Sequence, residues 1–197
     1  MKLKLTGPDF EFVRPYVERA LPEEIELSES DAACHTLLCS AGQGAALAAS
    51  HPEAAVLQLP VVIGTGMTGM PRELVERIWR GTFFHLRDVE TPVEAVHAVD
   101  VAAAVMLTAG RPGLYAVTDG APHDLDELAD ALAARLGDKR ILTAPRRWGR
   151  FLPGYALRRR FADIPRIFGG DFIAHFDFKP HNVSDYLRTH VYDENSL

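Results

Sequence analysis

The sequence predicts an α/β fold in which a parallel sheet is flanked by helices, and three observations carry this prediction. Short apolar runs rich in Leu and Val, bounded by glycine or proline, recur along the chain as in buried parallel strands. Segments with helical periodicity alternate with these runs, which is typical of layered α/β domains. The 197 residues, 47% of them hydrophobic and 24% charged, suffice to bury one core.

The elements follow in chain order from these patterns. We expect strands at residues 2–5, 25–27, 34–40, 54–64, 83–86, 113–120 and 140–144. We expect helices at residues 10–20, 44–50, 70–81, 125–137 and 183–191, and an extended piece that leads into a helix within 92–110.

For three of these helices the sequence also predicts an N-cap residue, an apolar face, or both. Asp100 is placed as the N-cap of the helix that ends at Gly110, and Asp124 as the N-cap of 125–137. Periodicity gives each of two helices an apolar face: Leu74, Val75, Ile78 and Trp79 in 70–81, and Leu125, Leu128, Ala129, Leu132 and Leu136 in 125–137.

Charge is unevenly distributed along the chain. The net charge is −6, yet residues 139–166 contain nine Lys/Arg and one acid, Asp163, which leaves 12 basic and 26 acidic residues elsewhere, or −14. We favour the interpretation that 146–166 is a basic amphipathic helix with inward-packing aromatic residues, which are Trp148, Phe151, Tyr155 and Phe161. The alternative is a surface for anionic ligand groups, an acidic partner or a membrane. We expect no nucleic-acid partner, because the acidic body would be repelled.

Composition also bears on location and on metals. No apolar run approaches the roughly 18 residues of a membrane helix, and the start of the chain lacks a signal-peptide pattern, so we expect a cytoplasmic protein with no membrane partner. Cys34 and Cys39 point to opposite faces of one predicted strand, which disfavours a disulfide or shared metal ligation. The histidines show no metal-ligand spacing, so we expect no metal.

The opening stretch "LTGPDFEFV" (5–13) raises the question of a phosphate loop. Thr6 and Gly7 follow a strand, as at the start of many dinucleotide-binding domains. The next two positions at the glycine spacing are Phe10 and Val13, however, and their side chains should weaken pyrophosphate binding severely.

Four later stretches resemble, in the right order, the extended short-chain dehydrogenase/reductase superfamily of the NAD-dependent epimerase/dehydratase type. They are "VLQLPVVIGTG" (56–66), "VHAVDVAAAVMLTA" (96–109), "GLYAVTDGAPHDLDELADALAARLG" (113–137) and "FDFKPHNVSDYLRTHVYDE" (176–194). In the first stretch, Gln58 stands where the family usually has arginine.

The resemblance implies a single Rossmann-like domain, with a shortened nucleotide-binding part at 1–66 and a substrate-side part at 67–197. It implies NAD or NADP near Thr6, Gly7, Leu59, Pro60 and Val61, although the opening stretch makes this binding doubtful. Ser40 matches the catalytic serine that hydrogen-bonds the substrate.

The resemblance also bears on the ligand and on assembly. Arg72 and Arg77 are placed beside the substrate pocket of a small-molecule ligand such as a nucleotide-sugar. Because the helix at 44–50 is short and rich in alanine, we expect a monomer or a weak homodimer.

One part of the family pattern is missing. The family's hydride transfer needs a tyrosine with a lysine four residues later, and Gln43 and Leu47 stand where that pair is expected. We therefore predict an epimerase/dehydratase-like protein with reduced or lost catalysis, and leave open whether it is an enzyme. The alternatives are a non-catalytic nucleotide- or ligand-binding regulatory module on the same fold, and a folded relic without an independent role.

Overall fold

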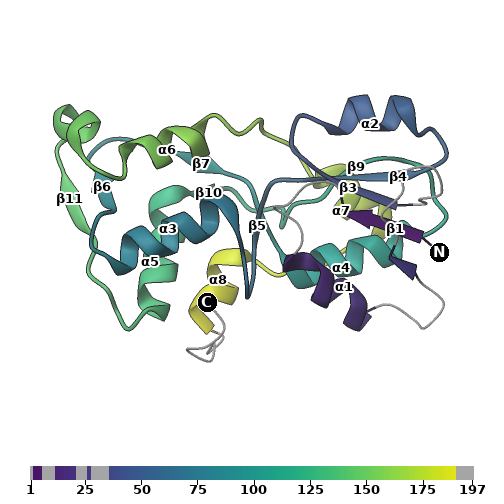
Figure 1. Ribbon diagram of the computed structural model, residues 1–197, viewed down its shortest axis with the longest axis horizontal. Coiled ribbons are helices and arrows are strands. Elements are labelled where there is room, and N and C mark those ends of the chain that lie inside the picture. The colour runs from purple at the N-terminus through teal and green to yellow at the C-terminus, as the bar shows by residue number, and fades with distance from the viewer. Residues whose placement is uncertain (1, 6–11, 21–25, 28–35, 190–197) are drawn as a thin grey trace.

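The larger sheet lies at one end of an elongated molecule, and a helix-rich part lies at the other (Figure 1). The structure is a computed structural model that describes residues 2–5, 12–20, 26–27 and 36–189. The larger sheet is entirely parallel, in the spatial order β2 (Glu26–Leu27), β1 (Lys2–Leu5), β3 (Thr36–Ser40), β4 (Ala55–Leu59) and β9 (Gly113–Ala116). The predicted α/β class, with a Rossmann-like parallel sheet, is confirmed.

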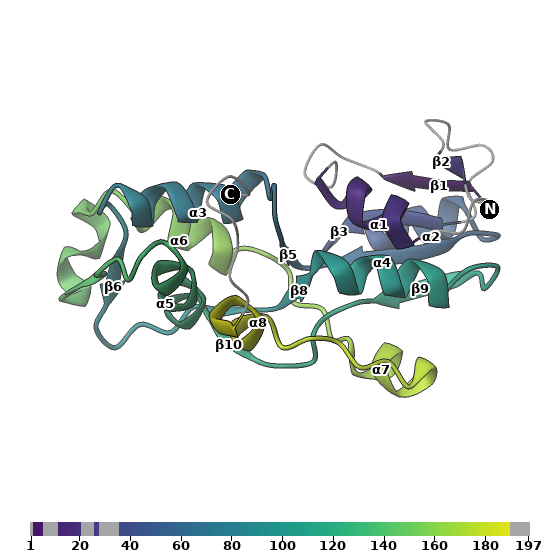
Figure 2. The same cartoon turned by 90° about the horizontal axis from the view of Figure 1, so that it is seen from below.

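Helices cover both faces of this sheet (Figures 1 and 2). On one face lie α1 (Arg14–Ala20) and α4 (Ala98–Leu107), and on the other lies α2 (Gly44–Ser50). Alternation along β3 sends Leu38 into the core under α1 and α4, and Leu37 into the smaller core under α2. The short helix α7 (Gly170–Phe176) packs beside the edge strand β9.

Pro60 divides the strand that the sequence predicts at 54–64. β4 ends at Leu59 in the larger sheet, and β5 (Val61–Ile63) pairs with β8 (Ala95–His97) in a separate two-stranded sheet. The single-strand prediction was wrong because proline has no N–H to donate to a continuing ladder. This division carries the chain from the larger sheet into the helix-rich part.

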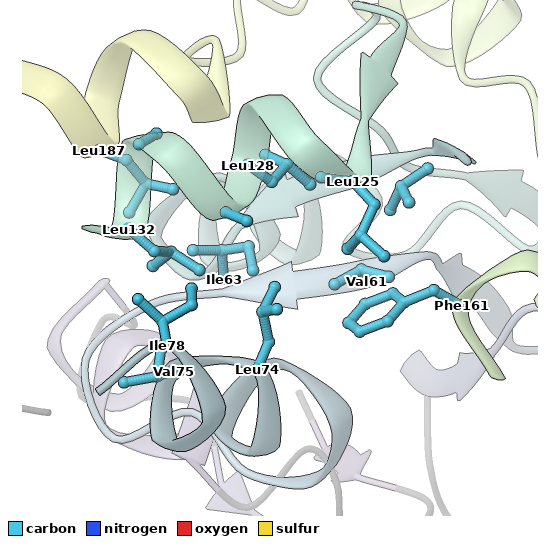
Figure 3. Packing of buried hydrophobic residues seen from close by; sticks show 14 of the residues in the cluster. Val61, Ile63, Leu74, Val75, Ile78, Leu125, Leu128, Leu132, Phe161 and Leu187 are labelled. Atoms are coloured by element: carbon cyan, nitrogen blue, oxygen red, sulfur yellow. The ribbon is translucent and has the colours of Figure 1, made fainter. Parts of the chain in front are cut away.

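The helix-rich part surrounds its own apolar core (Figure 3). Its helices are α3 (Gly69–Trp79), α5 (Leu125–Arg135), α6 (Tyr155–Ala162), α8 (Val183–Thr189) and the 3₁₀ helix η3 (Arg146–Phe151). Its short strands pair as β6 (Phe84–Leu86) with β11 (Leu142–Ala144), and as β7 (Pro92–Val93) with β10 (His123–Asp124). Figure 3 shows Leu74 and Ile78 of α3 facing Val61 and Ile63 of β5.

The chain passes between the two parts several times. After β8, α4 and β9 return to the larger sheet, and α5 then lies in the helix-rich part. Residues 98–117 therefore pack with the sheet, although they follow residue 66 in the sequence. The division into a nucleotide-binding part and a substrate-side part remains a prediction about function.

Two details of the helices differ from expectation. Trp79 is 60% exposed, while the other three members of its predicted stripe are buried. The N-cap of α4 is His97, whose Nδ1 accepts a hydrogen bond from Val99 N at 3.2 Å, and Asp100 lies in the first turn. Asp124 does cap α5, with Glu127 completing a capping box, so that prediction is confirmed.

Candidate functional site

A cavity of about 370 Å³ opens at the carboxyl ends of β3 and β4. Ligands of open parallel sheets bind at this edge, where strand ends leave backbone groups free of the ladder. The volume lies in the range of small-molecule sites. The lining residues are Phe12, Ser40, Ala41, Leu59, Pro60, Val61, Val62, Thr68, Gly69, Met70, Pro71, Arg160, Asp163, Ile164 and Pro165.

Four residues singled out from the sequence meet in this cavity: Ser40, Leu59, Pro60 and Val61. Ser40 is the exposed last residue of β3 and is the register partner of Leu59 on β4. A hydrogen bond of 2.9 Å from Ala41 N to Leu59 O fixes the two strand ends relative to one another. The structure thus brings these four residues together, and their roles remain predictions.

The beginning of α3 forms a second wall of the cavity. Thr68, Gly69 and Met70 line it, and no acidic residue lies in the first turn of the helix. The amides at a helix N-terminus carry a partial positive charge that favours anions. This wall is therefore compatible with a carboxylate or phosphate group on a ligand.

Arg160 contributes a cationic group from α6. Its Nη1 lies 2.5 Å from Glu73 Oε2, and its side chain is 54% exposed. Burial raises the pKa of Glu73, but hydrogen bonds from Arg77 and Arg160 outweigh burial and hold the pKa below its usual value. Glu73 therefore stays ionised and keeps Arg160 at the cavity.

Sequence reasoning assigned Arg160 only to the basic segment. It emphasised Arg72 and Arg77, which are not among the lining residues. Arg72 pairs with Glu76 at 3.1 Å, one turn further along α3. Arg77 binds Glu73 at 2.8 Å and donates to Pro153 O at 2.8 Å. No motif marks Arg160, since its approach to the cavity depends on how α6 packs against α3.

One described residue before α1, Val13, carries a side chain at a position where the glycine spacing of a phosphate loop has glycine. Thr6, Gly7 and Phe10 lie outside the described residues. Phe12 lines the cavity, and the side chain of Val13 is completely buried in the core against which α1 packs. A bare backbone is needed for close approach of phosphates and for helix–sheet contact, and Val13 places a branched side chain at that point.

Among the residues that the structure describes, the lining of the cavity includes no tyrosine, lysine or histidine. The described lining has two charged residues, Arg160 and Asp163, and arginine does not titrate near neutral pH. Tyr16 lies nearby, but its hydroxyl accepts a hydrogen bond from Thr65 N at 2.7 Å. Leu47, at the expected lysine position, packs against the core under α2.

Three clusters of ionisable groups lie away from the cavity. One joins Asp100 to His181, and another joins Arg158, Asp126 and His85. The third has the composition of a catalytic triad: Asp119 Oδ2 lies 2.6 Å from His123 Nε2, and Ser184 Oγ lies 3.0 Å from His123 Nδ1.

This third cluster is a structural element. The side chains of Asp119 and His123 are 0% and 2% exposed, so no substrate can reach them. Asp119 also accepts a hydrogen bond from Val183 N at 2.9 Å. The cluster therefore ties the start of α8 to the turn after β9. Over the described part of the chain, no group of three or more His, Cys, Asp or Glu is arranged to hold a metal ion.

Comparison with known proteins relates the chain to others by fold. No protein-family model matches the sequence, and no curated protein matches it. The solved UDP-N-acetylglucosamine 4-epimerase of Bacillus cereus superposes with a TM-score of 0.59 at 11% identity, covering 95% of this chain and 97% of that one. A conserved protein of unknown function from Silicibacter pomeroyi gives a TM-score of 0.63 at 11% identity and the same coverage.

UDP-glucose 4-epimerase of Thermus thermophilus, solved in complex with NAD, gives a TM-score of 0.55 at 19% identity, and the alignment covers 80% of this chain and 63% of that one. The chain thus has the fold of solved nucleotide-sugar epimerases, as the resemblance in the sequence implied. It matches some solved chains over almost their full length and others over less than two thirds. Within the described residues, no helix is long and apolar enough to cross a membrane.

Proposed function

We propose that this protein binds a small anionic ligand, such as a nucleotide-sugar, in the cavity at the ends of β3 and β4, and that its hydride-transfer chemistry is reduced or lost. The observation that carries the proposal is the cavity lining. It combines Ser40 and Arg160 with the start of α3, and its described residues include no tyrosine or lysine.

The lining suits a ligand with one anionic end and one less polar end. Arg160 and the first amides of α3 offer charge and hydrogen bonds to a phosphate group. Leu59, Pro60 and Met70 supply apolar contact area. Ser40 offers a hydroxyl that can donate to or accept from a sugar hydroxyl. Arg72 and Arg77 rank behind Arg160 as ligand contacts because they are not among the lining residues.

The groups available for proton transfer in the described lining support the proposal of reduced or lost catalysis. Oxidation of a sugar alcohol requires a base that accepts the hydroxyl proton, held within hydrogen-bond reach. Ser40 does not titrate near neutral pH, and Arg160 cannot accept a proton. Asp163 is exposed at the C-terminal end of α6.

NAD or NADP is the second candidate ligand, and the fold shared with an NAD-bound epimerase supports it. Val13 argues against dinucleotide binding. Its buried side chain stands at a position of the phosphate-loop spacing where glycine would allow the helix and the strand to pack closely. We therefore place binding of a nucleotide-sugar ahead of binding of a dinucleotide. This preference for a nucleotide-sugar over a dinucleotide is consistent with a non-catalytic binding or regulatory module. We propose that such a module acts in the cytoplasm as a monomer or a weak dimer.

Isothermal titration calorimetry tests the proposal with NAD, NADP and a series of UDP-, GDP- and TDP-sugars. We expect heat of binding from at least one sugar nucleotide and weaker or no binding of either dinucleotide. When both are present, we expect no conversion of the sugar nucleotide, as followed by chromatography of the sugar nucleotides. Tight NAD binding with turnover of a sugar nucleotide would contradict the proposal. Absence of binding by every compound would also overturn it.

A further inference from the structure

The end of the molecule farthest from the larger sheet is a basic tip, which we define as residues 139–151 (Figure 1). It contains β11 and η3 and carries five Lys/Arg, with no acidic residue among them. The remaining residues, 16 basic and 27 acidic, have a formal charge of −11. The tip is therefore opposite in net charge to the rest of the chain.

The 3₁₀ geometry of η3 determines which of its side chains face solvent. With three residues per turn, positions i and i+3 lie above one another. Gly149 is buried, and a Cβ there would meet Leu86 Cδ1 at 3.0 Å, so this position faces the protein. Arg147 with Arg150, and Trp148 with Phe151, then form two adjacent rows that face solvent.

The aromatic residues of the tip are unusually exposed. Trp148 is 56% and Phe151 73% exposed, and Leu142 on β11 is 52% exposed. The prediction that aromatic residues of this segment pack inward is thus wrong for Trp148 and Phe151 but right for Phe161, which is buried. The 3₁₀ turn is the reason, because an α-helix over 146–166 would have placed these residues with a different period.

The cationic groups of η3 are available to a partner. Arg146, Arg147 and Arg150 form no ion pair with any residue in the described part of the chain. The guanidinium of Arg150 lies 4.7 Å from the centre of the Phe151 ring, so charge and apolar area are presented together.

We propose that the basic tip docks the protein on an anionic lipid surface. Arginine and lysine near such a surface are attracted to its lipid phosphates, while tryptophan and phenylalanine enter the headgroup region. End-on contact also holds the acidic remainder of the molecule away from the negative surface. This departs from the expectation of no membrane partner, which rested on the lack of a spanning segment.

The shape of the tip favours a lipid surface over an acidic peptide. The cavity beside η3, lined by Leu86, Gly149 and Tyr155 among others, measures about 10 Å³, which is about the volume that one water needs. Peptide recognition uses a groove or a long sheet edge, and β11 has three residues. A protruding cluster of aromatic and arginine side chains is better suited to insertion into the headgroup region of a lipid surface than to binding an extended peptide.

The test uses fluorescence of the full chain with Trp79→Phe, which leaves Trp148 as the single tryptophan. We expect vesicles of phosphatidylcholine with 30% phosphatidylglycerol to shift Trp148 emission to shorter wavelength, and pure phosphatidylcholine vesicles to have little effect. Binding should weaken in 0.5 M NaCl. In co-sedimentation, the double variant Arg147→Gln/Arg150→Gln should bind anionic vesicles about 30-fold more weakly.

The matched control is Arg19→Gln/Arg111→Gln, which removes the same charge at two exposed positions outside the tip. It should bind vesicles like the unaltered chain, and circular dichroism should show each variant folded. Equal binding by the two double variants would overturn the proposal. So would an emission shift with poly-L-glutamate but none with anionic vesicles, because that result would assign the tip to an acidic polypeptide.

Discussion

Asp100 and His181, 81 residues apart in sequence, meet where the segment before α8 crosses the first turn of α4. Asp100 Oδ1 lies 2.8 Å from His181 Nδ1, and Asp100 Oδ2 accepts a hydrogen bond from His181 N at 2.9 Å. The carboxylate of Asp100 is 3% exposed. One buried acidic side chain thus anchors the C-terminal segment to the larger sheet.

Replacement of Asp100 by asparagine should leave stability at pH 7 within about 1 kcal/mol of the original. Burial raises the pKa of Asp100, and the hydrogen bonds from His181 do not fully offset it. A raised carboxyl pKa adds stability below the ordinary value near 4, and this stability is lost as pH rises through the raised pKa. The asparagine side chain keeps an acceptor for His181 N without the buried charge.

Replacement by alanine instead leaves His181 N without its acceptor and should cost about 1–3 kcal/mol. Urea unfolding between pH 4 and 7 compares the two variants, and the asparagine variant should also lose the part of the pH dependence due to Asp100. Equal destabilisation by both substitutions would show that the charge itself is required.

His85 should make the stability of the helix-rich part depend on pH. The Asp126 carboxylate, with Oδ1 3.0 Å from His85 Nδ1, raises the pKa of His85, although the contact is poorly directed for a hydrogen bond. Its stabilisation is therefore full below the ordinary histidine pKa near 6.5 and is lost as pH rises through the raised pKa. His85→Gln should cost about 1 kcal/mol at pH 6.

At pH 9 the same substitution should cost less, because the imidazole of the original protein loses its proton as pH rises through the raised pKa. Chemical denaturation at both pH values measures the difference. A matched substitution is His175→Gln, at an exposed position on α7. A cost for His85→Gln that is constant or grows with pH would contradict the assignment.

Gly169 and Gly170 form a matched pair that tests packing against Thr118. A Cβ on Gly169 would lie 2.9 Å from Thr118 N and closer still to Thr118 Oγ1, whereas a Cβ on Gly170 would meet no atom within 4 Å. We expect Gly169→Ala to destabilise the protein by about 1–3 kcal/mol. Gly170→Ala, in the first turn of α7, should be neutral or stabilise by up to about 1 kcal/mol. Thermal unfolding measures both, and equal melting temperatures would refute the close contact.

Arg160 should matter for ligand binding more than the other arginines near α3. Once a sugar nucleotide that binds has been found, Arg160→Gln should raise its Kd about five- to tenfold, an estimate kept modest because the side chain is half exposed. Arg80→Gln, at the exposed far end of the same helix α3, is the control. Calorimetry with Arg72→Gln in parallel decides whether Arg72, named from the sequence, or Arg160, found in the cavity lining, contacts the ligand. A larger rise in Kd for Arg72→Gln than for Arg160→Gln would place the ligand over α3.

Local patterns predicted the parts of the fold that depend on neighbouring residues. The helix cap at Asp124 was accessible because capping follows from a short stretch of sequence. Ser40 and Leu59, which lie opposite one another at the strand ends, were singled out through the family resemblance. Arg160 was not, because its place at the cavity is set by packing between helices distant in sequence. Trp148 was misplaced since nothing in its sequence separates a 3₁₀ turn from an α-helix.

Pro60 has a mechanical consequence for the whole molecule. Its fixed φ and missing N–H make it a stiff, single-residue joint between β4 and β5, while Leu59 and Val61 on either side both face the cavity. A ligand that contacts both residues would link the end of β4 to the start of β5. Its binding would therefore limit changes in the angle between the larger sheet and the helix-rich part.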